Sequence, residues 1–135
     1  MKYTGFKLNK IEAERFEGDQ QGNINVNSNF NLGKSKKEDV KDSKRTVFGF
    51  DFTYVIKYEE FATLSFKGTV FIEFEQEDKA LIKQIESSET TKDNDLRKFI
   101  LDIVLAKTHV ESLHLEEKLG LPFHIQSPRV KFGED

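Results

Sequence analysis

The sequence predicts an α+β fold: a four-stranded antiparallel sheet followed by one short and one long C-terminal helix, which pack on one face of the sheet. Three observations support this prediction. Through much of the chain up to Glu75, apolar residues recur at every second position, which is the spacing of strands. Two of these runs are joined by a short turn, as in a β-hairpin. From Lys79 onward the apolar spacing becomes helical.

The composition narrows the class of protein. A length of 135 residues fits a single domain spanning residues 1–135. The chain has no Cys, which excludes disulfides and thiolate chemistry, and its net charge of −3 gives no general attraction to nucleic acid. No apolar run approaches a membrane span, and the N-terminus lacks the apolar block of a signal peptide. We therefore expect a cytoplasmic protein that neither binds nucleic acid nor inserts into a membrane.

The first predicted strand covers Phe6 to Phe16, and its alternation changes phase partway along. Phe6 and Leu8 occupy even positions, whereas Ile11 and Ala13 occupy odd positions, so in a regular strand the two pairs would face opposite sides of the sheet. A bulge near Asn9 or Lys10 would return both pairs to the same face of the sheet.

The second predicted strand is the segment NINVNSNFNL, from Asn23 to Leu32. Asn occupies every odd position and mostly apolar residues occupy the even ones, so one face carries amides and the other faces a core. The segment from Lys34 to Arg45 follows, and nine of its twelve residues are charged. This composition predicts a solvated loop.

The third and fourth predicted strands form a long antiparallel hairpin that turns at Glu59–Glu60. Gly68 lies in the middle of the fourth strand, where the usual reason for a glycine is a bulge or a close approach of backbone. The apolar faces of the two strands match, and they carry Phe48, Phe50, Phe52, Tyr54, Ile56 and Tyr58 against Leu64, Phe66, Gly68, Val70, Ile72 and Phe74.

Two helices are predicted after the sheet: a short amphipathic helix from Lys79 to Ile85, and a long helix from about Asp95 to Leu119, closed by Gly120 and Pro122. The first half of the long helix is apolar almost all round between Phe99 and Ala106, so more than one neighbour must cover it. The sheet supplies one cover, and we expect a second subunit to supply the other. The predicted oligomer interface consists of Phe99, Ile100, Ile103 and Val104. The second half returns to one-sided spacing, with Val110, Leu113 and Leu115 expected to face inward.

The sequence offers no convincing catalytic or metal centre. Glu111, His114 and Glu117 share one helical face, but a zinc site needs a further strong ligand and a second shell, so a solvated charged face is the favoured interpretation. No nucleotide-binding, metalloprotease or calcium-binding motif occurs. We expect no enzymatic activity, no metal and no cofactor.

The chain has more apolar side chains than one sheet and two helices can cover. There are 13 Phe, and several lie at strand ends, on the minority face of the hairpin (Phe71) or beside the C-terminal prolines. Exposed apolar surface marks sites for partners or ligands. The residues predicted to bind a partner or ligand are Phe16, Ile24, Val26, Phe30, Phe61, Leu121 and Phe123.

Two local patterns and the order of elements resemble the SecB export-chaperone family, especially SecB-like relatives outside the proteobacteria. One pattern is the alternating second strand with Ile24-Asn-Val-Asn-Ser, and the other is the exit from the long helix, which reads GLPFHIQSPRVKF. A glycine in the fourth strand, here Gly68, also fits.

The resemblance implies a dimer of dimers in which the long helices are sandwiched between sheets. It also implies ATP-independent holding of non-native polypeptides in long apolar grooves. The clients can be exported precursors or antitoxins, and the sequence leaves both open. The alternative is a binding module of the same fold without a chaperone role, which would take a small lipid-like ligand or a protein. An enzyme with scattered active-site residues is the least favoured hypothesis.

Overall fold

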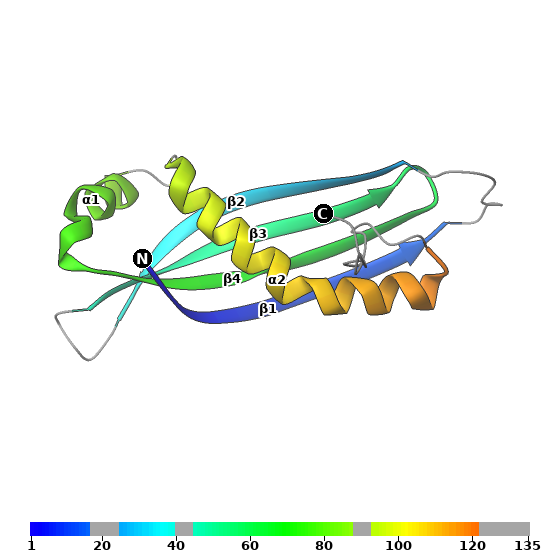
Figure 1. The fold of residues 1–135 in the computed structure, drawn as a ribbon, viewed down its shortest axis with the longest axis horizontal. Helices are drawn as coiled ribbons and strands as arrows, with labels where there is room; N and C mark the ends of the chain where they lie inside the picture. Colours follow the sequence, from blue (N-terminus) through cyan, green and yellow to red (C-terminus); the bar gives the residue numbers. More distant parts are fainter. Residues whose placement is uncertain (17–24, 40–44, 88–92, 122–135) are drawn as a thin grey trace, which may run out of the picture.

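The computed structural model describes residues 1–16, 25–39, 45–87 and 93–121. Its strands are β1 (Lys2–Arg15), β2 (Val26–Glu38), β3 (Thr46–Tyr58) and β4 (Ala62–Phe74), followed by the 3₁₀ turn η1 (Gln76–Asp78) and the helices α1 (Lys79–Ser87) and α2 (Asn94–Leu119) (Figure 1). All the pairings are antiparallel, and the strand order β1-β4-β3-β2 makes β1 and β2 the edges. The predicted four-stranded sheet with a short and a long helix is confirmed.

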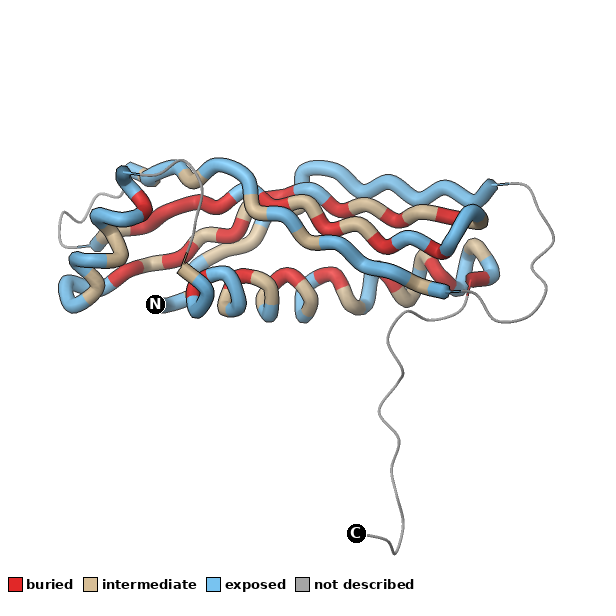
Figure 2. Tube along the Cα trace, turned by 90° about the horizontal axis from the view of Figure 1, so that it is seen from above, coloured by how far each residue is buried: buried red, intermediate tan, exposed pale blue. Residues whose placement is uncertain are grey.

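The core lies between the sheet and the long helix. One face of the β3–β4 hairpin is almost fully buried, and it meets buried residues of α2. Figure 2 shows the sheet and α2 as two layers, with burial concentrated in the central strands and in recurring turns of the helix. The apolar residues of β3 pair directly with those of β4, for example Phe50 with Val70 and Tyr54 with Phe66. The apolar faces of the two central strands therefore form one continuous surface.

The expected phase change in β1 is confirmed. The pairing of β1 with β4 shifts register between Leu8 and Lys10. Ile11 and Ala13 therefore pair with Phe66 and Leu64, on the same face of the sheet that Phe6 faces before the shift. The bulge keeps the apolar residues of β1 on the helix side despite the slip in the sequence pattern.

The prediction of a loop beginning at Lys34 is wrong for the first residues of that segment. Strand β2 continues to Glu38, with a register shift between Leu32 and Ser35. Lys36 and Lys37 pair with residues of β3 although they are exposed. Lysines are common on edge strands because they discourage pairing with other chains, and composition alone does not distinguish such a strand from a loop.

The long helix has a defined cap at each end. The Asp93 carboxylate accepts a hydrogen bond from the backbone N–H of Leu96 at 2.9 Å, and Gly120 adopts a left-handed conformation at φ 65°. Between these caps α2 crosses the sheet diagonally and bends near its middle (Figure 1). Thr108 and Ser112 donate hydrogen bonds to carbonyl oxygens of the preceding turn, both at 2.8 Å, an arrangement that often bends helices.

The face of the sheet that α2 does not cover carries the aromatic residue Phe71. Its cross-strand neighbours are Gly5 of β1 and Gly49 of β3. A Cβ atom built on Gly5 would lie 3.4 Å from the Phe71 ring, and one built on Gly49 would lie 3.1 Å from it. The ring therefore covers the backbone at two glycines, which accounts for one of the apolar side chains that the sequence left over.

Candidate functional site

Two half-buried apolar strips flank α2 on its side of the sheet. Because the helix crosses diagonally, it leaves parts of both edge strands uncovered (Figure 1). The β2 strip consists of Val26, Phe30 and Leu32, and the β1 strip consists of Tyr3, Phe6 and Leu8; all six pack against the core while remaining partly exposed.

The β2 strip is the one that the sequence predicted. Phe30 stacks on Phe52 of the neighbouring strand with ring centroids 6.4 Å apart, so one side of its ring is held by the core. Asn29 and Asn31 alternate with it and are exposed on the opposite face. Strand β2 thus presents an apolar row toward the helix side and an amide row toward the other side.

The β1 strip was not predicted as a site. The Phe6 ring stacks on Phe52, the same core residue that Phe30 contacts from β2, with ring centroids 5.5 Å apart. The Nζ atom of Lys107 lies 5.2 Å from the centroid of the Tyr3 ring, which places α2 beside the beginning of β1. The sequence pattern placed Phe6 and Leu8 on one face of the first strand without assigning them a site. Their partial exposure follows from the position of β1 at an edge of the sheet.

Three of the predicted binding residues gather at one end of the sheet. The backbone N–H of Phe16 donates to the carbonyl oxygen of Phe61 at 2.7 Å, and Phe16 is 42% exposed. Leu121, which follows α2, is buried, so it belongs to the core and not to an exposed binding surface. The remaining two predicted residues, Ile24 and Phe123, lie outside the described residues.

The predicted oligomer residues divide into two groups. Ile100 and Val104 are fully buried in the core of the protomer, so they cannot contact a second subunit directly. Phe99 and Ile103 stay half-buried at the side of the helix. They begin a stripe with alternating spacings of four and three residues, which we call the α2 stripe: Phe99, Ile103, Ala106, Val110 and Leu113.

Val110, at 63% exposed, is a residue of this stripe that the sequence prediction misplaced. It was expected to face inward, but the residues that face inward in this half of α2 are Thr108, Ser112 and Glu116. The fully buried positions recur every fourth residue from Leu96 to Glu116, and Val110 lies outside this row. A stripe of this spacing is the pattern by which helices pack against each other.

A buried polar contact joins the second half of α2 to the sheet. The Tyr58 hydroxyl donates a hydrogen bond to Glu116, and both residues are fully buried. Burial raises the pKa of the Tyr58 hydroxyl far above its ordinary value, and the hydrogen bond to Glu116 adds to the shift. The phenol therefore remains a hydrogen-bond donor over the whole physiological pH range.

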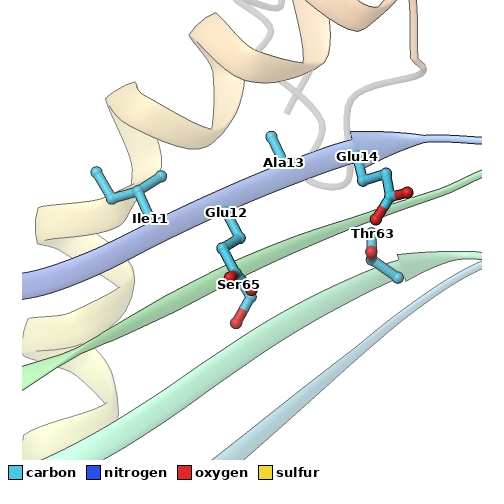
Figure 3. Close-up of a pocket in the computed structure, with 6 residues that line it drawn as sticks. All are labelled: Ile11, Glu12, Ala13, Glu14, Thr63 and Ser65. Carbon is cyan, nitrogen blue, oxygen red and sulfur yellow. The ribbon is translucent and has the colours of Figure 1, made fainter.

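A polar hollow of about 450 Å³ lies along β1 and β4, away from the apolar strips. Glu12 and Glu14 point to the same side as Ser65 and Thr63, while Ile11 and Ala13 lie on the other side of the edge strand (Figure 3). Glu12 is paired with Lys10 at 2.8 Å. Throughout the described residues, no group of three acidic, His or Cys side chains is placed to hold a metal ion.

No model of a known protein family matches the sequence, and no curated protein matches it. Among solved structures, the chain is similar to the Mycobacterium tuberculosis SecB-like chaperone Rv1957, solved in complex with a ChAD peptide from the Rv1956 HigA1 antitoxin. The similarity covers 96% of this chain and 91% of that chain, with a TM-score of 0.53 and 14% identity. In the part of the chain that the structure describes, no helix is long and apolar enough to cross a membrane. The chain therefore has the SecB-like fold that its sequence patterns predicted.

Proposed function

We propose that this protein is an ATP-independent holding chaperone that binds extended apolar segments of non-native polypeptides. The observation that carries the proposal is the pair of half-buried apolar strips on the edge strands, one on each side of α2. The similar solved structure is a chaperone bound to an antitoxin peptide, and not an enzyme. An antitoxin and an exported precursor are both suitable clients in this proposal, and the cytoplasm is the compartment where either would be met.

The dimensions of the β2 strip suit an extended segment. Val26 and Leu32 are six residues apart on a strand, which corresponds to about 20 Å at roughly 3.3 Å per residue. A client segment of six or seven residues could lie along it and make several weak apolar contacts. Such contacts tolerate varied sequences because no single side chain dominates the binding free energy.

The strips favour a polypeptide over the alternative, a compact lipid-like ligand. A small-molecule site is usually an enclosed concave pocket that buries most of its ligand. The strips instead follow the two edges of the sheet, and their side chains remain partly exposed along the row. This arrangement supports binding of a long, narrow ligand.

The proposal includes assembly into an oligomer, most simply a dimer of dimers. The α2 stripe leaves Val110 largely exposed, with Phe99 and Ile103 half-exposed behind it. A contiguous apolar patch of this kind on one helix is a typical protein–protein contact. A second copy of the chain can supply a matching stripe, since the same helix would pack against itself.

The experiment is suppression of aggregation of chemically unfolded clients at equimolar protein without ATP. We expect the wild-type protein to suppress aggregation and a triple variant of the β2 strip, Val26→Ser with Phe30→Ser and Leu32→Ser, to lose most of this effect. The matched control changes Asn27, Asn29 and Asn31 to Ser on the opposite face of the same strand. Equal protection by both triple variants would show that the strip is not the binding surface, and no protection by the wild type across several clients would contradict the function.

A further inference from the structure

One polar residue lies within the row of the β2 strip. Ser28 is placed between Val26 and Phe30, and like them it faces the helix side of the sheet, where it pairs with the buried Ile56. Val26 and Phe30 are half-buried, whereas Ser28 is exposed. From Val26 to Leu32 the row therefore consists of an apolar side chain, a hydroxyl group and two further apolar side chains.

A tyrosine of the core holds the Ser28 hydroxyl. Tyr54 of β3 pairs with Phe30, two residues along the strand from Ser28, and the hydroxyl groups of Tyr54 and Ser28 are hydrogen-bonded. Tyr54 is buried, and its ring stacks on Phe66 with centroids 6.3 Å apart, so the core fixes the position of the phenol. An exposed serine is thus oriented by a buried partner.

The direction of this hydrogen bond decides what Ser28 can still bind. Burial raises the pKa of the Tyr54 hydroxyl above its ordinary value, whereas the hydrogen bond with Ser28 lowers it, which is the effect of a donor on the phenol oxygen. Ser28 therefore donates its hydrogen to Tyr54. Its oxygen can still accept a hydrogen bond, but the hydroxyl has no second hydrogen to donate.

A client segment that covers the β2 strip would take water away from this oxygen. Along an extended chain the side chains of one face recur roughly every 7 Å, and the strip has the same spacing. One client side chain can therefore meet Ser28 while its neighbours, two residues away on either side, meet Val26 and Phe30. A buried acceptor without a partner weakens binding, and a donor on the client restores the lost hydrogen bond.

We propose that Ser28 selects client segments in which a side chain with a hydrogen-bond donor and no negative charge lies between two apolar side chains, each two residues away. Threonine, serine, asparagine and glutamine fit the central position, whereas valine, leucine and aspartate do not. Tyr54 is a positioning residue, since it takes the Ser28 hydrogen. This preference rests on the proposed function and narrows the class of segments that the β2 strip binds.

Fluorescence anisotropy with two labelled synthetic peptides tests the preference. Both carry leucine two residues to either side of the centre and glycine or glutamate elsewhere, which offer no competing donor side chain. Their central residue is threonine or valine, two side chains of nearly the same shape. The wild-type protein should bind the threonine peptide about fivefold more tightly, which is a usual gain from one hydrogen bond, although valine is more apolar. Equal affinities, or tighter binding of the valine peptide, would overturn the proposal.

Ser28→Ala removes the acceptor and should abolish or reverse this preference. The matched control is Asn29→Ala, which changes the next residue along β2, exposed on the opposite face of the sheet. It should keep the fivefold difference between the two peptides. A preference that persists in Ser28→Ala would belong to another group and would overturn the role of Ser28.

Tyr54→Phe tests the positioning role with a second pair of peptides, which carry asparagine or aspartate in the centre. The wild type should bind the asparagine peptide at least fivefold more tightly, because an ionised aspartate cannot donate a hydrogen bond. In the variant the Ser28 hydrogen is free to bind the carboxylate, so the difference should shrink about fivefold. An unchanged difference in the folded variant would overturn the role of Tyr54. The comparison of Ser28→Ala with Asn29→Ala decides the preference even if Tyr54→Phe fails to fold.

The outcomes separate this preference from the proposed function. Binding of all four peptides without discrimination would overturn the role of Ser28 and leave the chaperone function standing. If none of the peptides binds while unfolded clients do, the preference again fails alone. If neither peptides nor unfolded clients bind to the wild-type protein, the preference and the proposed function fail together.

Discussion

The carbonyl oxygen of Lys7 occupies the space that a side chain at Gly68 would need. A Cβ atom built on Gly68 would lie 2.1 Å from that oxygen and 3.0 Å from the Phe52 ring. The close approach lies next to the bulge of β1, which begins at Leu8. Glycine is therefore required here for the edge strand to pair with β4.

Gly68→Ala should lower the free energy of unfolding by about 2–4 kcal/mol, because backbone atoms must move to admit the methyl group. Urea denaturation measures this loss. Gly33→Ala is the control, since a Cβ there would make ordinary contacts of 3.6 Å with Asp51. That variant should be neutral or slightly more stable, within about 1 kcal/mol. Equal losses for both substitutions would contradict the close approach.

Much of the fold follows from local sequence patterns, because those patterns are enforced by contacts within single elements and within one hairpin. The alternation in β3 and β4, the slip near Asn9 and the caps of α2 are all of this kind. The inward position of Glu116 was not predictable in this way. Its partner Tyr58 lies 58 residues away in the sequence, so the contact is a tertiary one that no local pattern marks.

The candidate site was predictable only where alternation marked it. Val26 and Phe30 stand out because Asn residues flank them. Tyr3 and Leu8 carry no comparable signal, since their exposure depends on the diagonal path of the helix above them. Leu121 looked like a surplus apolar residue beside a proline, but the end of α2 buries it.

Phe71 and Phe30 should respond differently to substitution by alanine. Phe71→Ala uncovers the backbone at Gly5 and Gly49 and should cost about 1–2 kcal/mol of stability without weakening client binding. Phe30→Ala should weaken client binding by about 1 kcal/mol, which is less than the loss at an interface hot spot. Urea denaturation and client titration of both variants check this. A larger loss of binding for Phe71→Ala than for Phe30→Ala would place the site on the face that α2 does not cover and would contradict the proposed site.

Alkaline titration should show that the buried tyrosines resist ionisation. Burial raises the pKa values of both Tyr54 and Tyr58 above the ordinary value of 10.0, so the folded state holds their protons more tightly than the unfolded state. This contribution to stability is complete below pH 10 and is lost as the pH rises above it. Tyrosinate absorbance from these two residues should therefore appear together with the loss of circular dichroism. Ionisation of Tyr58 well before unfolding, identified by comparison with Tyr58→Phe, would contradict the buried contact.

Val110→Asp should dissociate the oligomer without unfolding the protomer, because Val110 is 63% exposed in the single chain. Ile100→Asp should instead unfold it, since that residue is fully buried and the charge would be left without water. Light scattering and circular dichroism at micromolar concentration separate the two results. Glu111→Lys, an exposed charge change beside the α2 stripe, should leave the assembly intact. A wild-type protein that is monomeric at this concentration would contradict the role of the stripe.

The most direct test of client binding on the helix side of the sheet is site-specific photocross-linking from adjacent positions of β2. Position 30 faces the helix side and position 29 faces the opposite side, so a photoreactive residue at each compares the two faces with almost no change of location along the strand. The account predicts that an unfolded client is captured from position 30, and also from position 26, while position 29 captures little or none. Equal capture from positions 29 and 30, or capture from position 29 alone, would contradict it.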